Sequence, residues 1–278
     1  KENDFITSYY LKKKYDKIDT NFITYALPNG SITEFLVLYE YIISEIKIDK
    51  LVFALVFDDL REHKIRLDIQ TLLKQKDLEA KFNTNSHRKK ILKKISKNSI
   101  TLKKYNTSVS FQDKIEVKII HKLNECCSYE KKKSVANSKI YHNLYLLRNS
   151  IFNINPTTER RIIPSIYEDN LESLDEIINI SKKKNVDLYF YIAPIRNDFK
   201  IPYNLEDYSS FKKFIKGISN KNEINFVNFE KIIPNYLWGT KPGTNLGTKK
   251  EIDFMHFQGP AHKILSENIF NFIESNDF

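Results

Sequence analysis

The stretch Lys50–Phe57, with the sequence KLVFALVF, constrains the fold most because it is almost wholly apolar. A strand without alternating polar residues has both faces covered, which is typical of a parallel sheet packed between helices. Upstream, the β-branched and aromatic run 22–27 precedes a turn at 28–30, and apolar residues then recur at helical spacing from 31 to 42. The order strand, helix, buried strand predicts a βαβ unit.

The same rhythm returns in the second half of the chain. We predict, in order, a helix at 169–184, a buried strand at 186–194, a helix at 207–219, a strand at 224–229, a long loop at 238–249 and a last helix at 260–274. Pro260 suits the first turn of that last helix, where its missing N–H has no cost. The predicted fold class is α/β, a three-layer α/β/α arrangement with a mostly parallel, flavodoxin-like sheet.

The middle of the chain differs, because it is rich in Lys and Asn and helical where it is periodic. We therefore predict a first part of the α/β domain at 1–60, a basic helical insertion or lid at 61–160, and a second part of the domain at 161–278. Within the insertion, 87–98 (HRKKILKKISKN) carries a strongly basic face. A solvated helix face is the favoured interpretation, and contact with an anionic lipid headgroup or polymer is the alternative.

Composition excludes several classes of function. The chain of 278 residues has a formal net charge of +10, but Lys outnumbers Arg, and nucleic-acid recognition leans on Arg, so nucleic acid is an unlikely partner. The two cysteines, Cys126 and Cys127, are adjacent, which favours two unpaired thiols. No phosphate-binding glycine motif and no His/Cys ligand spacing is present, so we expect no cofactor and no metal.

Polar residues follow the ends of the predicted strands. Asp58, Asp59 and Arg61 come after 50–57, and Arg196 comes after 186–194. Because the carboxyl ends of parallel strands share one edge of a sheet, we expect these side chains to lie close together. Each arginine could hold an anionic group of a substrate, although a surface ion pair is the favoured interpretation.

The segment DFMH, residues 253–256, lies beside the last helix. His256 could act as a general base, with Asp253 on a turn three residues earlier accepting the other ring N–H. A surface or capping histidine is the alternative. Trp238, in the predicted loop nearby, could stack on a sugar ring or simply anchor that loop.

These stretches, in this order, resemble the SGNH (GDSL-type) hydrolase superfamily, including the bacterial branch similar to DltD and alginate-acetylation proteins. The stretch DFMHFQGPAHKILSENIFNFI at 253–273 is similar to the last block of that family, and ALPNGSITEF at 26–35 to its second. The resemblance implies that Asp253 and His256 are the acid and base of a triad. It also implies that the Gly30 N–H stabilises an oxyanion.

The third and first blocks depart from the family. In LVFALVFDDL at 51–60, Val56 stands where Gly is expected and Asp58 where Asn is expected, while Asp59 matches. An ionised Asp58 cannot donate a hydrogen bond to an oxyanion. The first block, which carries the nucleophilic serine, is absent, so we expect that serine upstream of Lys1. Ser31 is a rival nucleophile, but a helix N-cap is the favoured role for it.

The resemblance implies an esterase or O-acyltransferase in the cell envelope, using Ser-His-Asp chemistry on a glycan or acylated cell-surface polymer. An acyl-donor membrane protein would be a further partner. The alternative is a non-catalytic SGNH-like module that binds a polymer or a membrane partner, which the departures at Val56 and Asp58 and the missing serine favour.

Overall fold

The computed structural model describes residues 6–16, 20–101, 143, 146–147, 149–247 and 249–276. The chain divides into two compact units. The larger unit consists of Lys1–Ser96, Glu159–Trp238 and Phe254–Phe278, and the smaller unit of Lys97–Thr158 and Gly239–Asp253. The adjacent cysteines and most of the predicted insertion lie outside the described residues.

The larger unit is a mixed α/β structure built on a parallel three-stranded sheet. Its strands are β1 (Lys50–Leu55), β2 (Asp187–Ile192) and β3 (Asn225–Asn228), in the spatial order β1-β2-β3. Both neighbouring pairs are parallel. Every residue of β2 after Asp187 is buried, because β2 is the central strand and both of its faces are covered. The α/β class and the parallel pairing are therefore confirmed.

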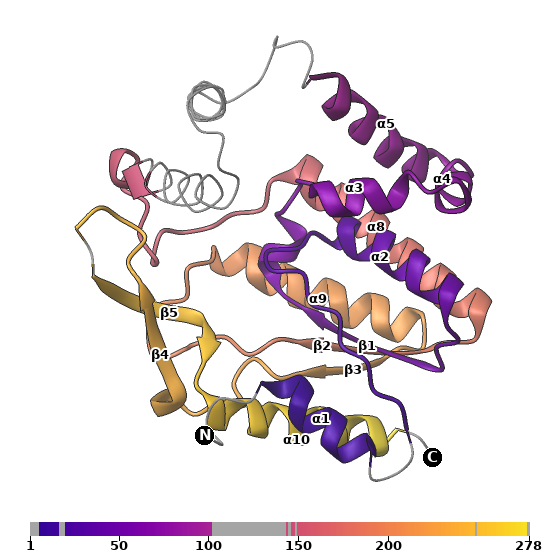
Figure 1. Cartoon of the computed structure of the whole chain (residues 1–278). Coiled ribbons are helices and arrows are strands. Elements are labelled where there is room, and N and C mark those ends of the chain that lie inside the picture. Colours follow the sequence, from indigo (N-terminus) through magenta and orange to yellow (C-terminus); the bar gives the residue numbers. More distant parts are fainter. Residues whose placement is uncertain are drawn as a thin grey trace, which may run out of the picture. The chain divides into compact units, whose positions relative to one another are not determined.

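Helices cover both faces of this sheet (Figure 1). On one side lie α2 (Ile32–Glu45), α8 (Pro164–Lys184) and α9 (Leu205–Lys221), and on the other lie α1 (Thr7–Tyr15) and α10 (Gly259–Glu274). Alternate residues of β2 face opposite sides, so Tyr189 and Tyr191 join the core formed with α1 and α10. Phe190, one position away, packs instead against Phe53 of β1, 6.1 Å between ring centroids. The sequence pattern placed α2, α9 and α10 within a few residues.

Three further helices, α3 (Leu67–Leu73), α4 (Lys76–Phe82) and α5 (Ser86–Thr101), follow β1 and the short 3-10 helix η3 (Phe57–Leu60). The basic side of α5 meets an acidic stripe on α8. Arg88, only 10% exposed, contacts Glu176 at 2.7 Å and also Glu40 of α2 at 3.1 Å. Lys90 and Lys94 both pair with Asp169.

This interface lies within the larger unit. The charges of Arg88, Lys90 and Lys94 are paired with its carboxylates, so these three side chains do not form a merely solvated face. Residues 61–96 belong to the larger unit, and the smaller unit begins at Lys97. Spacing along α5 could not reveal its partner, because α8 lies about eighty positions further along the chain.

Two local predictions were wrong. Residues 22–27 are extended but form no strand, and Ile23 and Tyr25 are more than half exposed. A strand needs a neighbour's hydrogen bonds, and none of the described residues pairs with this segment. The expected loop at 238–249 begins as β4 (Trp238–Pro242), after the 3-10 helix η4 (Asn235–Leu237).

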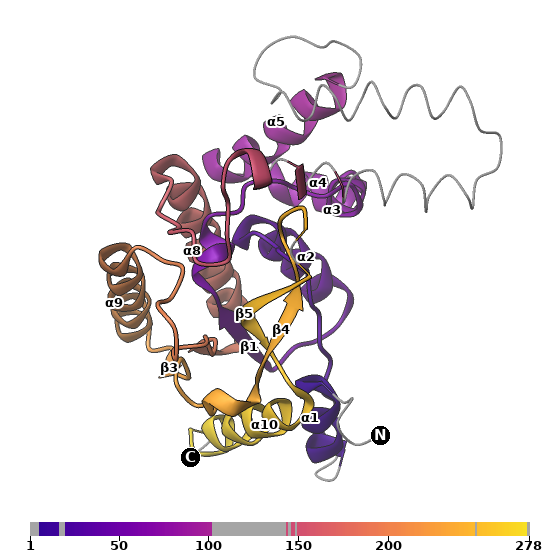
Figure 2. The same cartoon turned by 90° about the vertical axis from the view of Figure 1, so that its left-hand side faces the viewer.

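Strand β4 pairs with β5 (Lys250–Phe257), and the two run side by side in Figure 2. The DFMH segment is therefore part of a strand and not of a turn. Among the described residues, no helix combines the length and apolarity needed to cross a bilayer.

Candidate functional site

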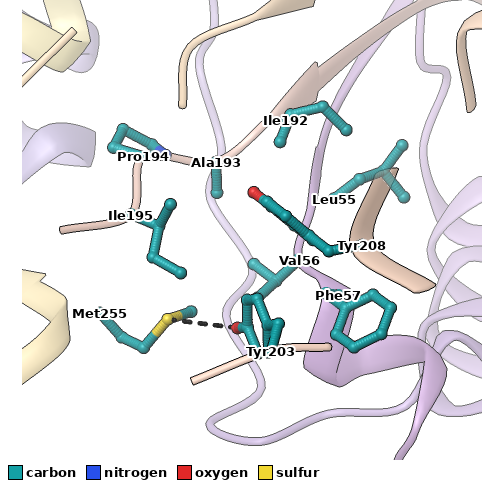
Figure 3. A pocket seen from close by; sticks show the side chains of 10 residues that line it. All are labelled: Leu55, Val56, Phe57, Ile192, Ala193, Pro194, Ile195, Tyr203, Tyr208 and Met255. Carbon is teal, nitrogen blue, oxygen red and sulfur yellow. Dashed lines mark hydrogen bonds between the residues drawn. The ribbon is translucent and has the colours of Figure 1, made fainter. Parts of the chain in front are cut away.

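The carboxyl ends of β1 and β2 meet at one edge of the sheet, as neighbouring parallel strands must. A cavity of about 10 Å³ lies there, close to the space that one water molecule needs. Figure 3 shows its walls, which come from both strand ends, from Tyr203 and Tyr208, and from Met255 of β5. This cavity itself is too small for a sugar ring.

Asp58 is the centre of an ionic cluster at this edge. Its Oδ1 accepts a hydrogen bond from Arg61 Nη1 at 2.9 Å, and its Oδ2 accepts from Arg160 and from the Tyr203 hydroxyl, the latter at 3.0 Å. The Tyr203 oxygen also lies 3.6 Å from Met255 Sδ, but the carboxylate is the stronger acceptor for its single proton. Arg61 further donates to the backbone oxygen of Arg161 at 2.6 Å.

The cluster explains the aspartate that stands where the resemblance expects asparagine. Two guanidinium groups and a hydroxyl donate to Asp58, so both of its oxygens act as acceptors. A side chain engaged in this way offers no donor to an oxyanion, so the oxyanion role expected at this position is not supported. For Arg61 the ion-pair interpretation holds, although its side chain is only 20% exposed and the pair is not a surface one.

Arg160 and Tyr203 were not among the residues that the sequence indicated. Arg160 is 102 positions from Asp58 in the sequence. It reaches this edge because its backbone is hydrogen-bonded to the segment before α9. Its N–H donates to Pro202 O, and its own carbonyl accepts from Asn204 N, each at 2.9 Å. The adjacent arginines Arg160 and Arg161, directly before Ile162 and Ile163, were the available sequence signal.

Asp59 lies beside Asp58 but in a different environment. Burial raises the pKa of the Asp59 carboxyl well above its usual range, and the neighbouring charge of Asp58 raises it further. The backbone N–H of Val56 acts in the opposite direction and does not offset the burial. Two adjacent carboxyls at one strand end thus have different surroundings: Asp58 is paired with two arginines, whereas burial biases Asp59 towards its neutral form.

Gly30 has a structural role in this fold. Its N–H donates to Leu27 O at 2.9 Å, which closes the turn before α2, so this donor is already used and is not offered to an oxyanion. A Cβ at this position would lie 2.8 Å from the Leu27 Cβ and 3.1 Å from the Phe35 ring. The glycine is therefore required for the close approach of the turn to α2.

Ser31 is a helix N-cap, as the residues around it favoured. Its Oγ accepts from Glu34 N, and the Glu34 carboxylate accepts from Ser31 N, both at 3.2 Å, which completes a capping box. The same carboxylate is held by Arg66, with Nε at 2.8 Å. Ser31 is fully buried, and a fully buried serine cannot reach a substrate.

Arg196 and Trp238 also take structural roles. Arg196 Nε and Nη2 donate to the two oxygens of Asp198 at 2.7 and 3.0 Å, and its guanidinium stacks over the Phe199 ring. Trp238 is 5% exposed and packs edge-on against Phe257, 5.4 Å between centroids. The tryptophan thus anchors the start of β4 and is not available to stack on a sugar.

The position of the predicted acid–base pair is set by β5. In a regular strand, residues three apart point to opposite faces, and the structure has Asp253 buried at 5% exposure and His256 exposed. The boundary between the two units also falls directly after Asp253. The pair lies on a strand rather than on the expected turn, and its catalytic role stays a prediction.

His262 lies close to His256 at the start of α10. Its Nδ1 is 2.9 Å from the Thr7 hydroxyl of α1, and its ring packs against Phe257, 4.5 Å between centroids. Burial lowers the pKa of His262, and the nearby His256 lowers it further. The residue joins α1 to α10, as expected of a helix-face histidine.

A second histidine cluster has the residue types of a hydrolytic triad but not its accessibility. His87 Nε2 lies 2.9 Å from Ser173 Oγ, and His87 Nδ1 lies 2.6 Å from Glu172 Oε2. That carboxylate contact is short but does not have hydrogen-bond geometry. Burial lowers the pKa of His87, which opposes the charged imidazolium that an ion pair would need. Ser173 is fully buried and bonded to Thr33 and to the Asp169 carbonyl. The cluster joins α2, α5 and α8, and although the Glu172 side chain is 55% exposed, the serine that would act as nucleophile is fully buried.

Comparisons with protein-family models, with curated proteins and with solved structures gave no match to this chain. Within the described residues, no group of three or more His, Cys, Asp or Glu side chains could hold a metal ion.

Gly30→Ala tests whether this glycine is structural. The new Cβ would meet Leu27 and Phe35, so we expect the free energy of unfolding in urea to fall by about 1–3 kcal/mol. Gly217→Ala is the control, because a Cβ there in α9 meets nothing within 4 Å; this change should leave stability the same or higher. Full stability of Gly30→Ala together with lost catalysis would instead assign the glycine to an oxyanion site.

Asp58→Asn should destabilise the protein. The change leaves Arg61 and Arg160 without their shared counter-charge at a partly buried edge, at a cost of about 1–2 kcal/mol in urea unfolding. Asp49→Asn is the exposed control, because the Lys47–Asp49 pair has side chains 89% and 76% exposed. Equal small effects for both variants would show that the cluster adds nothing to stability.

Asp59→Asn should raise the free energy of unfolding, and the size of this gain should depend on pH. The folded state binds the Asp59 proton more tightly than the unfolded state, so stability is lost as pH rises from about 4 through the raised pKa. Asparagine avoids that loss. We expect the variant to be more stable than the wild type at pH 7 by about 1 kcal/mol or more, and the gain to vanish near pH 4. A gain independent of pH would contradict the raised pKa.

Proposed function

We propose that the chain belongs to an SGNH-like esterase or O-acyltransferase that acts on a glycan or cell-envelope polymer, with a three-layer α/β/α arrangement. The observation that carries this proposal is the position of the DFMH segment, residues 253–256. Arg196 N, just after β2, donates to Phe254 O at 3.1 Å, and Met255 Sδ lies 3.6 Å from the Tyr203 hydroxyl at the end of β1. The segment bearing His256 thus meets the edge where parallel sheets collect ligands.

In the proposed reaction, His256 takes the proton of a serine hydroxyl while the serine Oγ attacks the acyl carbon. The tetrahedral oxyanion then collapses, the ester C–O bond breaks, and the imidazolium returns the proton to the leaving alcohol. Water or a glycan hydroxyl, deprotonated by the same imidazole, takes the acyl group from the serine. Asp253 would hold the ring in the required tautomer.

The oxyanion donors of this proposal differ from the family pattern. Gly30 N–H is engaged with Leu27, and Asp58 accepts hydrogen bonds on both oxygens. The serine's own backbone N–H is then the donor that the proposal retains. The serine itself is expected upstream of Lys1, so the experiment uses the natural full-length protein.

The second candidate function is a non-catalytic module of the same fold that binds a polymer or a membrane partner. The engaged Gly30 N–H, the ion-paired Asp58 and a cavity with room for about one water favour it. The two candidates differ in whether His256 matters to turnover.

Turnover of a chromogenic acetyl ester by the full-length protein separates them. If His256 is the base, His256→Ala should lower kcat about a thousandfold or more, because members of a triad act as a unit. His63→Ala, another exposed histidine in the larger unit, is the matched control and should leave kcat unchanged. Turnover that survives His256→Ala removes this histidine from the mechanism, and a wild-type protein without turnover supports the binding module.

A further inference from the structure

The excess positive charge of the chain is concentrated in the smaller unit. This unit holds 14 Lys and Arg against 6 Asp and Glu, a formal charge of +8, whereas the larger unit holds 31 against 29, a charge of +2. In the larger unit, Arg88, Lys90 and Lys94 of α5 are paired with carboxylates of α2 and α8. An anionic partner of the chain is therefore expected to bind the smaller unit.

The described part of the smaller unit has a compact tip. Asn149 is buried and its side-chain amide donates to Thr244 O at 2.9 Å, while Leu246 N donates to Ser150 Oγ at 3.0 Å. Asn245 adds a third tie through Ile154 O at 2.9 Å. These bonds fix the helical residues 149–151 against the turn that joins β4 to β5, and Figure 1 shows the two segments side by side.

Large apolar side chains are exposed on this tip. Ile151 is 67% exposed, Phe152 70%, Leu246 52% and Leu147 43%. Leu147 and Ile151 are four positions apart and so share one side of the helical segment, opposite to the buried Asn149. A group of large apolar side chains exposed together on one surface is typical of a contact surface. Lys249 and Lys250, both exposed, follow the same turn.

We propose that this tip docks on an anionic lipid surface. Exposed apolar side chains gain by entering the headgroup boundary, and nearby lysines gain by approaching acidic headgroups. A soluble polyanion would use the charge but leave Ile151 and Phe152 in water, so the combination favours a bilayer. The proposal does not depend on the ester chemistry. It places the contact with an anionic surface on this tip and not on residues 87–98.

Co-sedimentation with vesicles tests the proposal. The wild-type chain should bind vesicles of phosphatidylcholine mixed with phosphatidylglycerol and not vesicles of phosphatidylcholine alone. The double variant Ile151→Ser/Phe152→Ser should weaken binding about tenfold or more, through the lost apolar contact. Lys249→Gln/Lys250→Gln should weaken it to a similar extent, through the lost charge. Circular dichroism confirms that each variant is folded.

Leu67→Ser is the matched control, because Leu67 is 68% exposed but lies in α3 of the larger unit. It should leave vesicle binding unchanged. The proposal is overturned by no binding to the anionic vesicles, or by an equal loss in the Leu67 variant. Binding that depends on the lysines but not on Ile151 and Phe152 would indicate a polyanion site instead. A dimer in analytical ultracentrifugation that Phe152→Ser dissociates would assign the tip to a second copy.

Discussion

Burial of β2 on both faces is the constraint on which the larger unit depends. Its tyrosines must be covered from the side of α10 and its Phe190 and Ile192 from the other side, so helices are required on both faces of the sheet. A sheet covered in this way has no exposed face on which polar groups could converge. The strand ends remain, and there the Asp58 cluster, the small cavity and Met255 come together.

Charge compensation is the second organising principle, and it acts locally. At the end of β1 two arginines surround one carboxylate, and along α5 the arginine and lysines face the acids of α8. A net charge computed over the whole chain hides this pattern, because nearly neutral and strongly basic units are averaged. Asp58 and Asp59 show that the electrostatic surroundings can differ even between neighbouring residues. The first accepts hydrogen bonds from two arginines, and burial raises the pKa of the second.

Sequence patterns predicted what depends on local periodicity, including β1, the capping of α2 by Ser31 and the parallel pairing. They failed where the outcome depends on distant partners. A β-branched run such as 22–27 cannot become a strand unless another strand lies alongside, and Arg160 cannot be linked to Asp58 by spacing alone. The DFMH segment was expected on a turn, but it is part of a strand because it pairs with β4. Whether His256 is catalytic is a chemical matter that neither pattern nor fold decides.

The outer edge of β1 has a consequence for handling the protein. Among the described residues β1 pairs on one side only, and the extended segment that contains Ile23 and Tyr25 is apolar and exposed. An edge strand can pair with an extended segment of another chain, and a charged residue such as Lys50 at the start of β1 opposes this pairing. Concentrated solutions of the polypeptide should therefore be prone to intermolecular strand exchange, with β1 as the nucleating site of aggregation.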